Sequence, residues 1–567
     1  MGTTFADWRA SVERELEGKS FEKALVSEAF AGFSVQPLYA SAPRVPRDAS
    51  VEQVRFVMRH GPEARVGELV ADLTDGADGV WVSARSLRDE VLKRPELQSA
   101  FFIVDVDEAE ASGALASRLS GRSYALTVDP IGDAARGIAS VDAIETRVKA
   151  LPALAKRHRV TSVMVSTLPY HHAGAEADDE LACVLSAGVH TLQALIDGGL
   201  TPDEAASSVA LQVAVGRDTF VELCKLRALR LCWSKVLVAF LVKQAPRTLI
   251  HAVCSSRTLT TRDPWVNMLR VTTQVFAAML GGAQVVTANS FDQALGSPSA
   301  LGHRLARNTG LVLRDESHLG RVADAAGGSY AFESITDSLA RRAFAAFQAL
   351  EKDGGVVAAL KNGALVARFD ASWAKRLEGI AKRKTSILGV SEFANLNESK
   401  LAGAATATAS VAPGSLPVRR DSAAFEALRD IAEAKREVPE AILLTLGDYA
   451  SSRARAGFAS SFLTAGGIRT RETASVEKAS IACLCGTDER YAAEALDQVK
   501  ALKAAGCQQV VVAGRPGALE PALREAGVDA FIFVGCDAVA TLVAILGFDT
   551  PFDGAQDRLT LTGQERA

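Results

Sequence analysis

His251 is the side chain whose type and position best fit chemistry. It lies in Thr248–Cys254, a short apolar run with the composition of a buried strand. An imidazole in the carboxyl-terminal half of such a strand can face the axis of a barrel and can transfer a proton at neutral pH. The neighbouring sequence offers no second polar residue that could act with His251. A lone histidine on a buried strand is more often a core residue with its hydrogen bonds satisfied than a catalyst. We therefore favour a core role and keep catalysis as the alternative.

Polar residues also follow other predicted strands, where an α/β barrel builds its active site. They are Asp129, Ser166-Thr167, Gly216-Arg217, Ser255-Ser256 and Asn289. His171 and His172 stand in a further block of this kind, Tyr170–Ala175. Adjacent histidines can indicate a metal, but neither a helical i, i+4 histidine pair nor a nearby cysteine supports one. We predict that this pair is solvated or caps the core, and that the chain has no metal site.

The eight cysteines form no CxxC pair, so neither a zinc site nor a disulfide framework is predicted. Cys483 and Cys485 alternate within an apolar strand and therefore face the same side, which favours a place in the core. The eight are Cys183, Cys224, Cys232, Cys254, Cys483, Cys485, Cys507 and Cys536.

A barrel over residues 41–394 would position the polar strand ends. Seven short apolar runs alternate with helical segments, which predicts an all-parallel (β/α)8 TIM-type barrel. The position of the eighth strand is not decided by the sequence, because the segment Gly310–Arg314 fits either a strand or part of a helix. Asp263-Pro264 predicts a helix start, with Asp263 as the capping residue. The seven runs are Val80–Val82, Phe101–Val104, Tyr124–Val128, Ser162–Ser166, Val209–Val215, Thr248–Cys254 and Gln284–Ala288.

Residues 440–547 repeat the strand and helix alternation and predict a flavodoxin-like doubly wound domain. No G-x-G-x-x-G or P-loop opens a helix there, and the last histidine of the chain is His318. Its predicted strands are Ala441–Leu446, Ile481–Cys485, Gln509–Ala513 and Phe531–Val534, with Arg469–Glu472 as a further candidate.

The remaining segments are an arm, a linker and a tail. Residues 1–40 predict a helical arm and connector, and its apolar stripe is Phe5, Trp8, Val12 and Leu16. The stripe either folds back on the barrel or clamps a partner chain. Residues 395–439 read as a linker, rich in small residues up to Val418, and residues 548–567 as a loose polar tail.

The composition excludes several classes of protein. Hydrophobic residues make up 48% of the 567 residues and charged residues 23%, which is typical of a globular chain with a large core. The net charge of −4 does not favour nucleic acid or an anionic membrane. No apolar run reaches the ~18 residues of a membrane span, and no signal peptide is legible. We expect a cytoplasmic protein.

Several blocks resemble the methylmalonyl-CoA mutase family, in the order of that family. They are IHA (250–252), DPWVNMLR (263–270), MLGG (279–282), RLARNTGLVLRDES (304–317) and GGSYAFE (327–333). The resemblance implies that residues 440–547 correspond to a cobalamin-binding domain. It also implies a role in the adenosylcobalamin-dependent interconversion of methylmalonyl-CoA and succinyl-CoA by radical rearrangement.

The resemblance also shows where this chain departs from a catalytic member. His251 matches a histidine that contacts the substrate carbonyl, but the family's Tyr- and Arg-rich tunnel segment has no match in residues 40–80. In the D-x-H-x-x-G loop, which supplies the cobalt ligand, Asp448 is kept, Ala450 replaces histidine and Arg453 replaces glycine. A Gly-Gly pair becomes Ala513-Gly514. We therefore predict no catalytic residue, with His251 vestigial, and no cofactor-binding residue on this chain.

The resemblance thus implies the small, non-catalytic subunit of a heterodimeric mutase. It would stabilise the large subunit, which binds adenosylcobalamin, and the arm would contact that partner. A GTPase metallochaperone is a further candidate partner. The enzyme alternative is an active acyl-CoA mutase subunit that uses His251 and takes cobalamin from a separate small protein. A third alternative, FMN binding by the flavodoxin-like domain, rests on fold alone.

Overall fold

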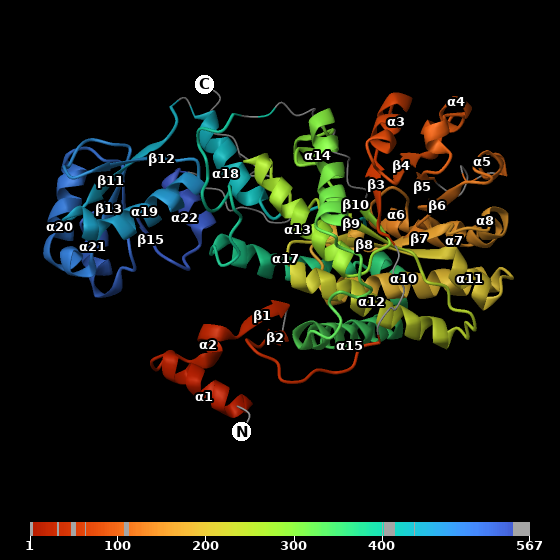
Figure 1. Ribbon diagram of the computed structural model, residues 1–567. Helices are drawn as coiled ribbons and strands as arrows, with labels where there is room; N and C mark the ends of the chain where they lie inside the picture. Colours follow the sequence, from red (N-terminus) through yellow and green to blue (C-terminus); the bar gives the residue numbers. More distant parts are fainter. Residues whose placement is uncertain are drawn as a thin grey trace.

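The predicted parallel barrel is present in the computed structural model, which describes residues 4–30, 33–46, 53–62, 64–106, 111, 113–399, 401, 414–435 and 437–547 (Figure 1). Eight parallel strands pair in the order β6-β5-β4-β3-β10-β9-β8-β7. A bridge between Val128 and Val163 joins the two ends, so the sheet closes on itself. The strands are β3 Arg55–Arg59, β4 Gly79–Ser83, β5 Phe101–Asp105, β6 Ser123–Leu126, β7 Val163–Ser166, β8 Val209–Val215, β9 Ile250–Cys254 and β10 Val285–Thr287.

Helices surround the barrel because each parallel strand needs a crossover to reach the next one. They are α3 Val66–Thr74, α4 Asp89–Leu92, α5 Gly113–Arg118, α6 Pro130–Ala135, α7 Ile144–Val148, α8 Leu151–His158, α9 Leu168–His172, α10 Ala177–Asp197, α11 Pro202–Ser208, α12 Thr219–Ala239, α13 Asn267–Leu280 and α14 Ala300–Leu311. Helices α15 Tyr330–Lys352, α16 Gly355–Lys361 and α17 Ala364–Ala381 follow the last barrel helix. No described helix has the length and apolar character needed to cross a membrane.

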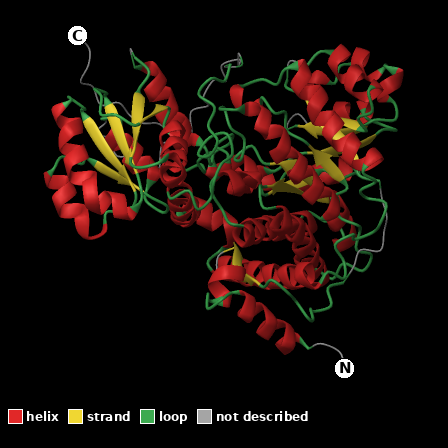
Figure 2. Cartoon of the chain, turned by 60° about the vertical axis from the view of Figure 1, so that its left-hand side comes forward, coloured by secondary structure: helices red, strands yellow, loops and turns green. Residues whose placement is uncertain are grey.

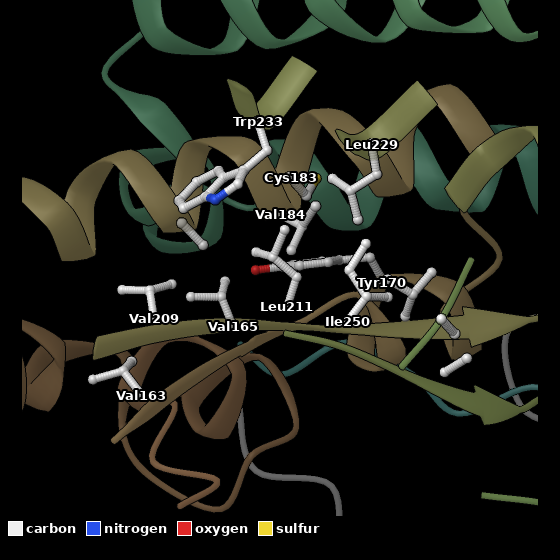
Figure 3. Packing of buried hydrophobic residues seen from close by; sticks show 14 of the residues in the cluster. Val163, Val165, Tyr170, Cys183, Val184, Val209, Leu211, Leu229, Trp233 and Ile250 are labelled. Carbon is white, nitrogen blue, oxygen red and sulfur yellow. The ribbon is translucent and has the colours of Figure 1, made fainter. Parts of the chain in front are cut away.

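The main core lies between the strands and the long helices α10 and α12 (Figure 3). Trp233 of α12 packs there with Val184 and Leu211. Gly188 of α10 makes this approach possible, because a Cβ atom at Gly188 would lie 2.5 Å from the Trp233 ring. A larger side chain at position 188 would displace the indole from the core.

The structure settles the open segment of the barrel and adds a strand that was not predicted. The open segment Gly310–Arg314 is helical: α14 ends at Leu311 and a π-helical turn covers Val312–Glu316. The eighth strand is instead β3, which the sequence analysis did not identify. Its three apolar residues stand between Arg55 and Arg59, and these two charged residues interrupt the apolar pattern. The structure shows why the arginines are tolerated: each guanidinium stacks on an aromatic ring, Arg55 on Phe101 and Arg59 on Trp81.

The prediction that Asp263 caps a helix is wrong. Asp263 has a left-handed backbone (φ 44°), and its side chain caps no amide. A 3₁₀ turn, Pro264–Val266, follows it, and α13 begins only at Asn267. The Asp263 amide donates to the carboxylate of Glu398, 2.5 Å away. This contact with a residue distant in sequence is not visible in the local pattern.

The second domain has the predicted flavodoxin-like topology. Its parallel strands pair in the order β12-β11-β13-β14-β15, which is the doubly wound order 2-1-3-4-5. Helices lie on both faces of this sheet (Figure 2). The elements are β11 Glu440–Thr445, α19 Tyr449–Ala465, β12 Arg469–Thr473, β13 Ile481–Cys485, α20 Asp488–Ala504, β14 Gln509–Ala513, α21 Glu520–Glu525, β15 Ala530–Ile532 and α22 Ala538–Ile545. Cys483 and Cys485 are buried in its core, as predicted.

The range predicted as a linker contains a helix, α18 Ala423–Ala434. Phe425 and Leu428 of α18 belong to the core of the second domain. Ion pairs join α18 to the barrel, because Arg262 contacts Glu433 at 2.8 Å and also reaches Asp430. Residues 402–413 of the predicted linker and the predicted tail, 548–567, lie outside the described residues.

The N-terminal arm begins with a part that projects away from the barrel and ends in a part that lies beside α15 (Figure 1), where Phe33 and Val35 pack against the main core. It consists of α1 Phe5–Glu15, α2 Phe21–Leu25 and a hairpin, β1 Ser27–Phe30 and β2 Phe33–Val35, that the sequence analysis did not predict. No residue of α1 is buried, and Phe5 is 45% exposed. The Phe5 and Trp8 rings contact each other, and Trp8 meets Phe21 edge to face. Of the apolar stripe, Phe5 is therefore exposed, whereas Trp8, Val12 and Leu16 are half-buried by the rest of this chain.

Candidate functional site

Apolar side chains fill the interior of the barrel. Trp81 and Phe101 are the largest, and they pack with Met164 and with smaller residues from the other strands. Interior side chains in layers make such a barrel a packed core. The cluster comprises Val57, Trp81, Phe101, Ile103, Ala125, Met164, Leu168, Ala210, Ala214, Val253 and Val285.

His251 is buried within this interior. Its Nε2 lies 2.9 Å from the Thr287 hydroxyl, and its Nδ1 lies 3.2 Å from the Gln212 amide nitrogen. The ring also meets Trp81 edge to face, with centroids 5.1 Å apart. Burial and the nearby Arg59 charge lower the pKa of His251 to about 3. The imidazole is therefore neutral, and both ring nitrogens already have partners within the chain.

A cavity of about 460 Å³ opens at the carboxyl ends of the strands, but its lining does not include His251. Two of the predicted strand-end residues, Asp129 and Ser166, line it. Burial raises the pKa of Asp129 to about 6, although it also accepts hydrogen bonds from the amides of Gly132 and Ser166. Charged residues around it are Arg59, Arg85, Asp105, Asp129, Asp133 and Arg136. The cavity thus combines these charged groups with an apolar lining that includes Trp81 and Met164.

The other predicted strand-end residues lie elsewhere. Asn289 donates to the Cys254 carbonyl oxygen at 2.7 Å, and the Thr167 hydroxyl accepts from the Ala214 amide at 2.8 Å. Ser255 is buried against His171. The loops thus use these side chains to hold the strand ends together and do not gather them into one site.

His171 belongs to a buried polar network. Its Nε2 lies 2.6 Å from the Ser255 hydroxyl and its Nδ1 lies 2.6 Å from the Glu180 carboxylate. Lys225 joins this carboxylate to that of Glu222, at 2.8 and 2.6 Å. The Ser–His–Glu order resembles a hydrolase triad. All three side chains are almost completely buried, however, and Lys225 neutralises Glu180, so the set holds α9, α10 and α12 together.

His172 completes the predicted histidine pair at the edge of the core. It lines the strand-end cavity, and its Nε2 lies 3.0 Å from the Ser256 hydroxyl. Burial and the charge of Arg257 lower the pKa of His172 to about 4. Both histidines therefore act as neutral hydrogen-bonding groups that cap the core.

In the second domain, Asp448 is the N-cap of α19 and accepts from the Ser451 amide at 3.0 Å. Ala450 and Arg453 are exposed on the first turns of this helix. A methyl group at position 450 offers no lone pair to a metal. The cap explains why the aspartate suits this position even where no histidine follows it.

Tyr491 and Arg455 fill the carboxyl edge of this sheet, which is where doubly wound folds bind their ligands. The Tyr491 hydroxyl lies 2.8 Å from the Ala513 carbonyl oxygen and accepts from the Gly486 amide at 3.1 Å. The Arg455 guanidinium stacks on the Tyr491 ring at 4.9 Å. A Cβ atom at Gly514 would lie 3.1 Å from Arg455 Nη1, so the loop after β14 packs directly against the pair.

Neither Tyr491 nor Arg455 was predicted from the sequence, and the Trp81–Arg59 pair in the barrel was not predicted either. The only signal for Tyr491 was an aromatic residue in the first turn of the helix after β13. Trp81 was hidden because it stands inside an apolar strand, where its side chain reads as ordinary core.

Comparisons with known proteins agree with the fold. The sequence profile of the family described as Methylmalonyl-CoA mutase matches residues 140–453. The chain is 34% identical to the methylmalonyl-CoA mutase small subunit of Streptomyces virginiae, covering 96% of each chain. It is 27% identical to the small subunit of Porphyromonas gingivalis over 95% of this chain and 96% of that one. The methylmalonyl-CoA mutase of Escherichia coli is 33% identical over 41% of this chain and 33% of its own length.

Proposed function

Because the chain belongs to the methylmalonyl-CoA mutase family, we propose that it is the small subunit of a heterodimeric mutase and performs no catalysis itself. It stabilises a large subunit that binds adenosylcobalamin and interconverts methylmalonyl-CoA and succinyl-CoA. The near-full-length similarity to two small subunits supports this role. Co-expression with an untagged large subunit tests it: the two chains should co-purify in equal amounts, and failure to associate would contradict the proposal.

The observation that carries the non-catalytic part is the filled barrel. An acyl-CoA substrate needs a passage to the reacting group, whereas Trp81, Phe101 and Met164 pack together in the barrel interior and the lining of the strand-end cavity does not include His251. His251 lies among them with both nitrogens engaged. The same features disfavour an active subunit that uses His251 with cobalamin from a separate protein.

The residues of the second domain do not fit cobalamin. Ala450 offers no ligand to cobalt, and the chain has no histidine after His318. Tyr491 bridges the strand ends at the carboxyl edge, and Arg455 covers its ring. A bound corrinoid would have to displace both side chains and leave the Ala513 carbonyl and the Gly486 amide without their partner. We therefore place the cofactor on the large subunit.

The first prediction concerns His251. In the assembled complex, His251→Ala should leave turnover within about twofold, whereas loss of an acid, base or hydrogen-bonding group in a working site costs ~10²–10⁴-fold. Its effect should be on stability, about 1–3 kcal/mol, because Thr287 and Gln212 lose a buried partner. Steady-state kinetics and thermal unfolding of the same samples separate the two. His251→Gln, which retains hydrogen-bonding groups, serves as the control, and a large rate loss in a correctly assembled Ala variant would revive the enzyme alternative.

The second prediction concerns cobalamin. The purified chain mixed with adenosylcobalamin and gel-filtered should retain no stoichiometric cobalt. Ala450→His alone should not change this result, because Tyr491 and Arg455 still fill the carboxyl edge. Ala450→Ser is the matched control. Cobalt content and the visible spectrum give the answer, and a base-off, imidazole-ligated spectrum from the unmodified chain would refute the placement of the cofactor.

A further inference from the structure

Two histidines and an aspartate converge beside the barrel seam between β3 and β10. His60 follows β3, Asp72 lies on α3, and His303 lies in the first turns of α14. Figure 1 shows α3 and α14 next to each other above β3. One potential ligand atom from each of the three lies within 4.8 Å of the other two. Nothing in the proposed function uses this cluster.

The contacts within the cluster are close without being hydrogen bonds. His60 Nε2 lies 3.0 Å from Asp72 Oδ2, and His303 Nδ1 lies 3.9 Å from the same oxygen. Both nitrogens are buried, and neither has a hydrogen-bond partner. The carboxylate oxygen therefore lies off the axis of the His60 nitrogen. Two atoms bound to one ion at ~2.0–2.1 Å lie roughly 3–3.5 Å apart and off each other's axis, which is the relation seen between His60 and Asp72.

Arg307 fixes the orientation of the carboxylate. It contacts Oδ1 of Asp72 at 2.6 Å and also pairs with Asp75 at 2.9 Å. Oδ2, the other oxygen, is left facing the two imidazoles. Partners of this kind, which hold a ligand without touching the ion, are a regular part of protein metal sites. Asp75 balances the positive charge of Arg307 next to the site.

We propose that His60, Asp72 and His303 bind a divalent first-row transition ion, with Zn²⁺ as the best match. Two imidazoles and one carboxylate are a ligand set of zinc sites that keep a fourth position for water or another ligand. Mg²⁺ and Ca²⁺ prefer oxygen ligands and do not fit two imidazoles. The fourth position faces the side of His303, whose side chain is 26% exposed, while His60 and Asp72 are enclosed. The ion would tie β3, α3 and α14 together where the first and last strands of the barrel meet.

The test measures zinc on the full chain after chelator treatment, addition of Zn²⁺ and desalting. We expect one zinc per chain by mass spectrometry of metals and a higher melting temperature with Zn²⁺ than without it. His303→Asn should weaken binding by more than the ~10–100-fold that loss of a supporting contact costs. His303→Cys should restore much of it, because a thiolate is also a zinc ligand. Co²⁺ in place of Zn²⁺ should give visible absorption bands that disappear in His303→Asn.

The matched control is His190→Asn. His190 of α10 also pairs with a carboxylate, Glu145 at 3.6 Å, but it is not part of a three-residue cluster among the described residues. This variant should bind zinc as the unmodified chain does. Circular dichroism confirms that each variant is folded. The proposal is overturned if the unmodified chain keeps no zinc after desalting, or if His190→Asn loses as much zinc as His303→Asn.

Discussion

The double substitution Phe5→Ser and Trp8→Ser should weaken binding to the large subunit at least ~100-fold, which corresponds to about 2.7 kcal/mol. Phe5 is 45% exposed, and no residue of α1 is buried by this chain. Large aromatic residues dominate the binding energy of interfaces, and truncation of a central one costs ~2–4 kcal/mol. Titration of the large subunit with each form of the chain, followed by analytical ultracentrifugation, measures the change.

Val238→Ser is the matched control for the arm. Val238 is 71% exposed near the end of α12, a helix of the barrel. The substitution removes exposed apolar surface of the same kind and should leave affinity unchanged. Equal affinity of the arm variant and the unmodified chain would show that the stripe does not contact the partner. The rest of the proposed role would then depend on another surface.

Lys225→Met should lower the free energy of unfolding by about 3–5 kcal/mol, the range for removing one partner of a buried ion pair. Lys225 is fully buried, and it is the cation between the carboxylates of Glu180 and Glu222. Without it, two carboxylates share a site that water does not reach. Denaturant unfolding measures the loss. Lys235→Met, on an exposed position of the same helix, should change stability by less than ~0.5 kcal/mol.

The loss of unfolding free energy caused by Lys225→Met should depend on pH. Burial raises the pKa of Glu222 above its ordinary value of 4.5, and Lys225 opposes this rise. Removal of Lys225 raises the folded-state pKa further, so the variant takes up a proton on folding. A group with a raised folded pKa loses stability as pH rises, and the deficit is therefore largest near neutral pH and shrinks below about pH 4.5. Adding Glu222→Gln should recover part of the loss at pH 7. A deficit independent of pH would mean that packing, not charge, sets the cost.

The sequence by itself determined the two-domain α/β architecture. Seven barrel strands and four of the five strands of the second domain are short apolar runs that can be recognised from the sequence, whereas β12 is polar and was only a candidate. β3 was not predicted because its two arginines interrupt the apolar pattern. These arginines are tolerated in the fold because Phe101 and Trp81 supply aromatic faces for them. The helix start at Asp263 was misjudged for a related reason. The backbone amide of Asp263 donates to the carboxylate of Glu398, which lies more than a hundred residues away in the sequence.

For the candidate sites, the sequence determined which chemical groups are present, and the tertiary structure decided which of them meet. Ala450 in the place of a cobalt ligand is a fact of residue type and needs no coordinates. That Tyr491 bridges the strand ends at the carboxyl edge depends on β13, β14 and α20 packing together. The cluster of His60, Asp72 and His303 likewise has no local signature, since more than two hundred residues separate His303 from the other two. Closure of the barrel brings β3 beside β10, and only this long-range pairing places the three side chains together.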